Sequence, residues 1–154
     1  MAQDYEWTVN PGGSVADIDA DANMGNEWRD EDSGKYRRVM SAGSLTGGRV
    51  RNAAGEDLGK IEEIMLDVPT GRVAYAVLSF GGFLGMGNKL FAVPWEALTL
   101  NEQEPEFLLN INKQQLENAP GFDKDNWPDM ADPNWGTEIY NYYGKRPHWD
   151  DRRT

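Results

Sequence analysis

A glycine-rich stretch at residues 79–95, SFGGFLGMGNKLFAVPW, is the first part of this sequence that could do chemistry. Glycine-rich loops can hold a phosphate group, because their backbone amides come close to the anion. The glycines here follow the order Gly-x-x-Gly-x-Gly, the reverse of the dinucleotide-binding pattern, and no Lys-Ser or Lys-Thr follows them. A strand is expected after this loop, so the helix N-terminus that attracts phosphate is missing. The spacing therefore predicts a hairpin arm and not a nucleotide site.

Three large apolar side chains interrupt these glycines: Phe83, Leu84 and Met86. Two interpretations stay open for them. Either they fold back onto the chain's own sheet, or they dock into another subunit. Because exposed apolar clusters rarely persist unless they meet a partner, we predict that these three residues belong to a partner interface.

Two acidic patterns could also do chemistry. Glu62 and Glu63 could form a catalytic pair, but neighbours in a strand point to opposite faces and cannot easily share a substrate. The DIDAD stretch at residues 17–21 resembles the start of a calcium loop. The glycine and glutamate required at the sixth and twelfth loop positions are alanine and tryptophan here. We therefore predict a solvated strand in the first case and no calcium site in the second.

The residue types needed for most catalytic or metal centres are scarce. The 154 residues include no cysteine and a single histidine, His148. A thiol nucleophile is therefore excluded, and a zinc site or a histidine-based triad has too few ligands or bases. We predict a protein that is not an enzyme, with no catalytic residue, no metal site and no directly bound cofactor.

The overall composition limits the classes of partner. The formal net charge is -11, which opposes direct binding to nucleic acid or anionic lipid. No apolar run of about 18 residues is present, so we expect no membrane span. The acidic N-terminus lacks the basic and apolar regions of a secretory signal, and we predict a cytoplasmic protein.

Charge and aromatic content divide the chain into three predicted parts. Residues 1–38 form an acidic, extended N-terminal arm, because residues 1–34 hold nine acids against one arginine. Residues 39–122 carry the alternating and β-branched patterns of strands, and we take them as one folded domain. Residues 123–154 are rich in aromatics and proline, which indicates an irregular extension laid over an apolar surface.

The middle part predicts an all-β fold with one short helix at 113–118. Both faces of residues 73–80 are apolar, which is typical of a central, well-covered strand. Pro69-Thr70-Gly71 has good turn chemistry between two strands. Short strands with turn signals and little helix favour a small β-barrel. The expected strands are 49–52, 58–68, 73–80, 89–93 and 106–111.

The aromatic residues of the C-terminal extension are too many for a solvated tail. Each ring buries a large area, on this chain's own barrel or on a partner. We predict that five of them join the loop residues in a partner interface: Trp127, Trp135, Tyr140, Tyr143 and Trp149.

The stretch NAAGEDLGKIEEIMLDVPTGRVAYAVLSFGGFLGMGNKLFAVPWEAL resembles the PRC-barrel domain. The resemblance rests on Gly55 and Gly59 around an acidic pair, Asp67 before the turn, Tyr75, and KLFAVPW at 89–95. It covers residues 39–122, and the C-terminal part is similar to the extension of free-standing bacterial PRC-barrel proteins. A barrel of this kind also forms the cytoplasmic part of the photosynthetic reaction-centre H subunit and half of a ribosome maturation factor.

The resemblance implies a non-enzymatic module that holds other proteins together. In the H subunit the barrel caps the cytoplasmic face of the pigment-protein core and helps guide protons to the secondary quinone. An acidic residue on that route matches Asp57 here. The first prediction is therefore a structural subunit that caps the cytoplasmic face of a membrane complex, with a photosynthetic reaction centre as the specific expectation. Pigments and quinone would belong to the partner complex alone.

Two other functions stay open. One is a free-standing PRC-barrel homodimer linked to stress or envelope homeostasis. The other is an RNA-processing or ribosome-assembly adaptor that binds a basic protein and not the RNA itself. In all three cases the partner is a protein. Only the first places the chain at the cytoplasmic face of the inner membrane.

Overall fold

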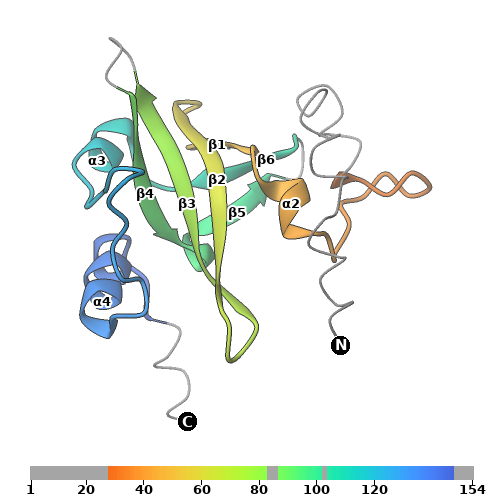
Figure 1. The fold of residues 1–154 in the computed structure, drawn as a ribbon. Coiled ribbons are helices and arrows are strands. Elements are labelled where there is room, and N and C mark those ends of the chain that lie inside the picture. Colours follow the sequence, from red (N-terminus) through yellow and green to blue (C-terminus); the bar gives the residue numbers. More distant parts are fainter. Residues whose placement is uncertain (1–27, 83–86, 102–103, 148–154) are drawn as a thin grey trace. The chain divides into compact units, whose positions relative to one another are not determined.

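The computed structural model describes residues 28–82, 87–101 and 104–147 (Figure 1). Several predicted features lie outside these ranges: the 17–21 motif, Phe83, Leu84, Met86, His148 and Trp149. The chain forms two compact units, residues 1–45 and 46–154, which are considered separately below. The division into three parts at 38 and 122 remains a prediction.

The second unit is built on one six-stranded sheet that curls on itself (Figure 1). Its strand order is β4-β3-β2-β1-β6-β5. Neighbouring strands are antiparallel except β1 and β6, which are parallel. The strands are β1 (Arg49–Arg51), β2 (Asp57–Asp67), β3 (Arg72–Gly82), β4 (Gly87–Pro94), β5 (Leu98–Asn101) and β6 (Glu106–Leu109). The predicted all-β class is confirmed.

The long β2–β3 hairpin is the centre of this sheet. Its turn forms where the sequence predicts it. The backbone N–H groups of Thr70 and Gly71 donate to the carbonyl of Asp67 at 3.2 and 2.8 Å and close the turn. Gly71 has a φ of 77°, a left-handed conformation that glycine adopts without strain. The turn is therefore closed on the backbone carbonyl of Asp67.

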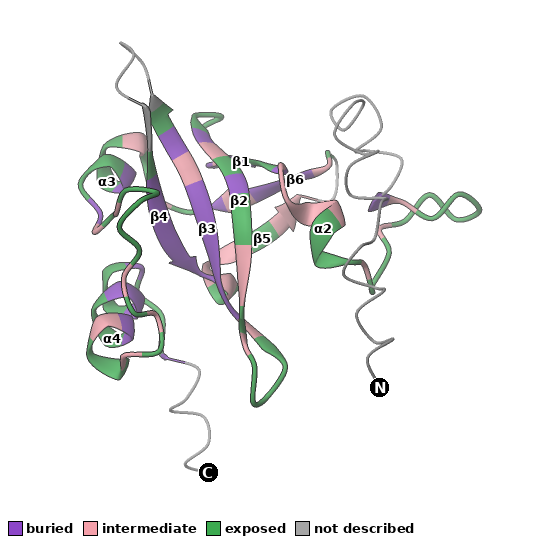
Figure 2. Ribbon diagram, viewed as in Figure 1, coloured by how far each residue is buried: buried purple, intermediate pink, exposed green. Residues whose placement is uncertain are grey.

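The buried core lies mainly on β3 and β4. Residues 74–78 of β3 are all buried, which confirms the prediction of a covered central strand. Figure 2 shows the same buried run continuing along β4. The predicted short helix is α3 (Lys113–Glu117), which begins with a capping box made by Asn112 and Gln115 and contacts β2.

The prediction of an irregular C-terminal extension was wrong for part of that segment. Residues Pro133–Tyr142 form a ten-residue helix, α4, that packs against β4. Asp132 caps it by accepting a hydrogen bond from the Asn134 amide, and Pro133 occupies the first turn, where a missing N–H costs nothing. The many aromatic residues of this stretch made the helical pattern, with its one buried face, difficult to recognise in the sequence.

The strand Leu98–Asn101 and the short 3-10 helix η3 (Trp95–Ala97) were not predicted from the sequence. The Trp95 ring packs edge-on against Phe107 of β6, with 5.6 Å between centroids. This contact ties the end of β4 to the far side of the sheet. Pro94 ends β4, as the sequence predicts, and β6 is two residues shorter than expected.

The described part of the first unit folds back on itself. Arg29 and Tyr36 form an antiparallel bridge, and the Arg29 guanidinium lies 4.3 Å from the Tyr36 ring centroid. The Trp28 indole N–H donates to the carbonyl of Ser44 in the short helix α2 (Ala42–Leu45) at 2.9 Å. These residues form a tight turn, so an extended arm could lie only in residues 1–27, outside the described ranges.

Candidate functional site

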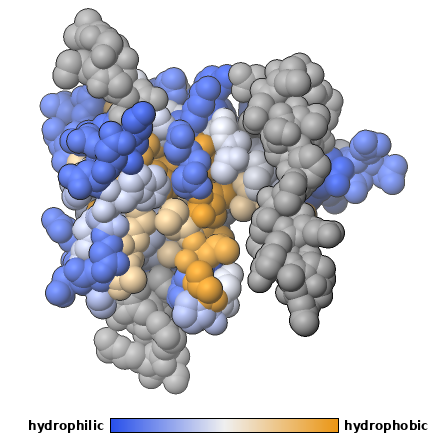
Figure 3. Space-filling model, viewed as in Figure 1, coloured by the Kyte–Doolittle hydropathy of each residue, from blue (hydrophilic) through white to orange (hydrophobic). Residues whose placement is uncertain are grey.

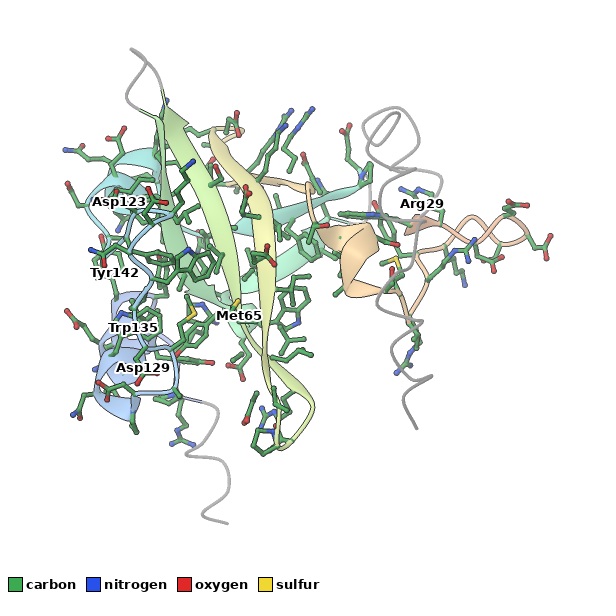
Figure 4. All side chains as sticks on the ribbon, viewed as in Figure 1. Arg29, Met65, Asp123, Asp129, Trp135 and Tyr142 are labelled. Carbon is green, nitrogen blue, oxygen red and sulfur yellow. The ribbon has the colours of Figure 1, made fainter. Side chains whose placement is uncertain are left out.

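An apolar groove lies at the turn end of the β2–β3 hairpin, where it meets the loop before α4. The groove has a volume of about 450 Å³. Figure 3 shows apolar side chains gathered over this half of the hairpin. Met65 on β2 and Trp135 on α4 mark the two elements that border it (Figure 4). The apolar lining residues are Met65, Leu66, Val68, Pro69, Ala74, Tyr75, Met130, Ala131 and Pro133.

Two side chains at the hairpin end are unusually exposed for their type. Leu66 is 54% exposed and Val68 is 81% exposed. Single exposed apolar residues are common, but here they adjoin an apolar concavity. Such an arrangement is typical of a surface that contacts another molecule.

Three aromatic rings fix the wall of the groove. Tyr75 on β3 packs edge-on against Trp135 and Tyr140 of α4, with ring centroids 5.3 and 5.5 Å apart. The Tyr140 hydroxyl donates to the carbonyl of Ala74 at 3.1 Å in a buried contact. Because this cluster holds α4 against β3, the groove is largely preformed.

Burial keeps the tyrosine hydroxyls of this cluster protonated. Removal from water raises the pKa of Tyr75 to about 12. The pKa of Tyr140 is also raised, first by burial and then by nearby Tyr75 and Glu96. The Tyr75 hydroxyl is buried without a hydrogen-bond partner among the described residues. The cluster is therefore a neutral packing surface and has no general base at neutral pH.

Carboxylates supply the only charges that the described lining carries. Asp67 comes from the end of β2, and Asp132 comes from the start of α4. One Asp132 oxygen accepts from the Asn134 amide at 2.9 Å. Asp67 stands opposite Arg72 in the hairpin, so Asp132 is the lining carboxylate that favours a positive charge beside an apolar occupant.

The structure places the predicted C-terminal interface residues in two ways. Tyr140 and Tyr143 are buried, and Trp135 is half-buried against Tyr75. Trp127 is 41% exposed and packs against Phe122 with 5.0 Å between centroids. Tyr140 and Trp135 thus cover this chain's own sheet, one of the two surfaces left open above, and Tyr143 packs against Tyr142. Their contact with a partner, and that of Trp127, remains a prediction.

Asp57 lies at the start of β2, away from the groove. Its side chain is exposed, and it accepts a hydrogen bond from the Gly59 amide at 2.9 Å. It lines a second, polar hollow with Lys60 and Lys113. Glu62 and Glu63 are both exposed, as expected for a solvated strand.

The groove residues of β2 were not predicted as a site. Met65, Leu66 and Val68 were assigned to a strand, and their neighbour Met130 to an irregular segment. The available signal was Met65-Leu66, two adjacent apolar residues near a hairpin turn. The strand register shifts between them, and both line the groove. Their partners across the groove lie more than 60 positions later in the sequence, which local patterns cannot reveal.

A model of the PRC-barrel domain family matches residues 37–116. This match covers more than half of the 154 residues, so the chain belongs to the PRC-barrel domain family. The family consists of interaction or structural domains and is generally non-catalytic. No curated protein matches the chain.

Among the residues that the structure describes, no three histidine, cysteine or acidic side chains come close enough to hold a metal ion. No helix within the same described ranges is long and apolar enough to cross a membrane.

Proposed function

We propose that this chain is a non-enzymatic interaction subunit that docks onto a partner protein through the apolar groove. The observation that carries the proposal is the combination of a preformed apolar concavity with the exposed side chains of Leu66 and Val68. Membership of a generally non-catalytic family of interaction domains supports it.

The groove favours one kind of occupant, a segment that presents an apolar side chain next to a lysine or arginine. Leu66, Val68 and Met130 provide apolar contact, and Asp132 provides negative charge at the same place. The chain's net charge of -11 steers it toward basic surfaces in general. An acidic chain with an apolar groove thus selects a basic, amphipathic partner segment.

The specific partner that we propose is a subunit of a membrane complex, contacted at its cytoplasmic face. A photosynthetic reaction centre, capped as by an H subunit, is the best specific candidate, and it rests on the family resemblance. Proton delivery through Asp57 rests on the same resemblance. A homodimer and a ribosome-assembly adaptor are the alternatives, and each would present a different protein to the groove.

Site-specific crosslinking in native cells tests the proposal. A photoreactive amino acid at position 66 should crosslink to one partner protein, which mass spectrometry identifies. The same amino acid at Glu138, an exposed position of α4 outside the groove lining, provides the control. The proposal predicts a crosslink from position 66 and none from 138.

The identity of the crosslinked protein separates the candidates. A reaction-centre subunit, with bacteriochlorophyll absorption in the purified complex, supports the capping function. A second copy of this chain supports the homodimer, and a ribosomal protein supports the adaptor. Equal crosslinking from positions 66 and 138, or from neither, would overturn docking through the groove.

A further inference from the structure

A second hollow lies at the other end of the β2 and β3 strands, away from the groove. It has a volume of about 850 Å³. Four basic side chains line it: Arg49, Arg51, Lys60 and Lys113. Two carboxylates, Asp57 and Glu62, line it as well, and Glu106 pairs with Arg51 from just outside the lining, so these cations exceed the carboxylates by one. This excess contrasts with the whole chain, in which acidic residues outnumber basic ones by 11.

The first unusual feature of this hollow is the placement of two cations. Arg49 of β1 and Lys60 of β2 are direct partners in the antiparallel register, and both are exposed. Like charges directly opposite each other destabilise a sheet. Neither side chain forms an ion pair or a hydrogen bond with another described residue. No contact among the described residues therefore explains this pair of cations by a contribution to the stability of the fold.

The remaining cations are held in position by the fold. The Arg51 Nε lies 3.3 Å from a carboxylate oxygen of Glu106, which is buried, and the other oxygen of Glu106 accepts from the Asn101 amide group at 2.8 Å. The Lys113 Nζ lies 6.0 Å from the ring centroid of Phe80. The first contact fixes the direction of the Arg51 guanidinium, and the second places the Lys113 ammonium near the Phe80 ring.

A network at the start of α3 sets the position of Lys113. Glu56 accepts hydrogen bonds from the Asn52 side chain at 2.7 Å and from the Lys113 amide at 3.1 Å. The Asn52 side chain also donates to the carbonyl of Ile111 at 3.0 Å, and Asn52 is buried. These hydrogen bonds join the β1–β2 turn to the start of α3 beside the hollow.

Three glycines leave part of the backbone around the hollow without side chains. Gly55, Gly59 and Gly81 line the hollow, and all three have φ between 89° and 105°. No atom lies within 4 Å of where a Cβ would stand on Gly55 or Gly81. Small residues let an anion approach backbone and cations together, as in other anion-binding concavities.

We infer that this hollow binds the phosphate group of a small anion. Arg and Lys are the side chains that recognise phosphate, and a hollow of this size accommodates a small molecule. The phosphate could belong to a soluble metabolite or to a lipid headgroup. The chain's charge of -11 repels the many charges of an anionic membrane more strongly than one small anion, so we expect the soluble source. This inference does not depend on docking through the groove.

Calorimetry with sodium pyrophosphate tests the site in the full chain. The double variant Arg49→Gln/Lys60→Gln should bind pyrophosphate at least tenfold more weakly than the unmodified chain. The double variant Lys124→Gln/Lys145→Gln removes the same charge from exposed positions outside the hollow, and it should bind as the unmodified chain does. Amide NMR signals of Gly59 and Gly81 should shift on titration.

Vesicles distinguish the source of the phosphate. Flotation with phosphatidylglycerol vesicles, compared with phosphatidylcholine vesicles, should show no binding if the ligand is soluble. If the chain binds phosphatidylglycerol vesicles, and Arg49→Gln/Lys60→Gln abolishes this binding while Lys124→Gln/Lys145→Gln does not, the same phosphate site would take a lipid ligand. Absence of binding to both probes, or equal weakening in the two double variants, would overturn the inference.

The stability of the same variants gives an independent readout. If Arg49 and Lys60 serve a ligand, their replacement removes a repulsion, and the urea midpoint without anion should stay equal or rise. A fall in that midpoint would show that the two cations stabilise the fold. The apolar groove is unchanged in these variants, so their results leave the docking proposal intact.

Discussion

At the scale of single residues, a few side chains and glycines decide whether the strands can approach. Gly59 has a φ of 105°, and a Cβ on it would stand 2.2 Å from the carbonyl oxygen of Ser79. The adjacent strand therefore requires glycine at this position. Gly55 shares the left-handed conformation, with a φ of 89°, but faces open space.

This pair of glycines gives a prediction with an internal control. Gly59→Ala should lower the free energy of unfolding by about 3 kcal/mol, because it adds a backbone clash to the strain of positive φ. Gly55→Ala should cost about 1 kcal/mol, the strain alone. Urea denaturation of both variants measures the difference. Equal losses would contradict the close approach of β2 and β3 at Gly59.

Glu56 gives a prediction about pH. Hydrogen bonds from the Asn52 side chain and then the Lys113 amide hold the pKa of its carboxyl below the usual value of 4.5. A lowered pKa in the folded state means stabilisation above the unfolded pKa, lost as the pH falls through the folded value. The urea midpoint should therefore fall less between about pH 6 and 3 in Glu56→Gln than in the unmodified chain.

The control for Glu56 is Glu62→Gln. Glu62 is exposed and makes no hydrogen bond to another described residue. Urea titrations of both variants across the same pH range provide the comparison. An equal change of pH dependence in the two variants would contradict a specific contribution of the Asn52–Glu56 contact.

At the scale of elements, α4 owes its place to tertiary contacts more than to helix propensity. Its sequence, PNWGTEIYNY, includes glycine, threonine and asparagine, which are weak helix formers. The helix is stabilised by its Asp132 cap and by burial of Ile139 and Tyr140 against the sheet. Its position then defines one wall of the groove.

Removing the hydroxyl group from each of two tyrosines in this part of the chain should have different effects on stability. Tyr140→Phe removes a buried hydrogen bond to Ala74 and should lower the free energy of unfolding by about 1 kcal/mol. The Tyr143 hydroxyl is buried with no hydrogen-bond partner among the described residues. Tyr143→Phe should leave stability unchanged or raise it, because an unsatisfied polar group is removed.

Thermal or urea unfolding of Tyr140→Phe and Tyr143→Phe measures this contrast. Both changes remove one hydroxyl and leave the ring in place, so volume effects are matched. A greater loss in Tyr143→Phe than in Tyr140→Phe would contradict the packing of α4 described above.

The elements differ in how far the sequence alone determines them. The β3 strand was predictable because residues 73–80 are apolar on both faces, a local signal of burial. The α4 helix was not, because its buried face is defined by contacts with β3 and β4. The groove was also not predictable, since Leu66 and Met130 meet only after folding. The local sequence pattern is therefore sufficient to predict a strand such as β3, whereas the groove depends on packing between segments that are far apart in the sequence.

At the scale of the whole molecule, the second unit carries two different surfaces on one hairpin. The turn end of β2 and β3 presents an apolar groove with two carboxylates. The other end presents a hollow with four cations. The rigid sheet between them separates the two chemistries. The two proposals together place a protein contact and an anion site at opposite ends of the same hairpin.

The central claim is that a partner protein binds at the groove, and a matched pair of variants tests it most directly. Val68→Asp places a charge in the groove, and Val39→Asp makes the same change at a residue of the first unit that is not part of the groove lining. Val68 is 81% exposed and Val39 is 88% exposed, so neither change should unfold the chain.

Tagged forms of both variants and of the unmodified chain would be isolated from native cells in mild detergent. The partner that crosslinks to position 66 would then be quantified by mass spectrometry. The proposal predicts that Val68→Asp loses this partner by at least tenfold and that Val39→Asp retains it. Full retention of the partner by Val68→Asp would contradict docking through the groove.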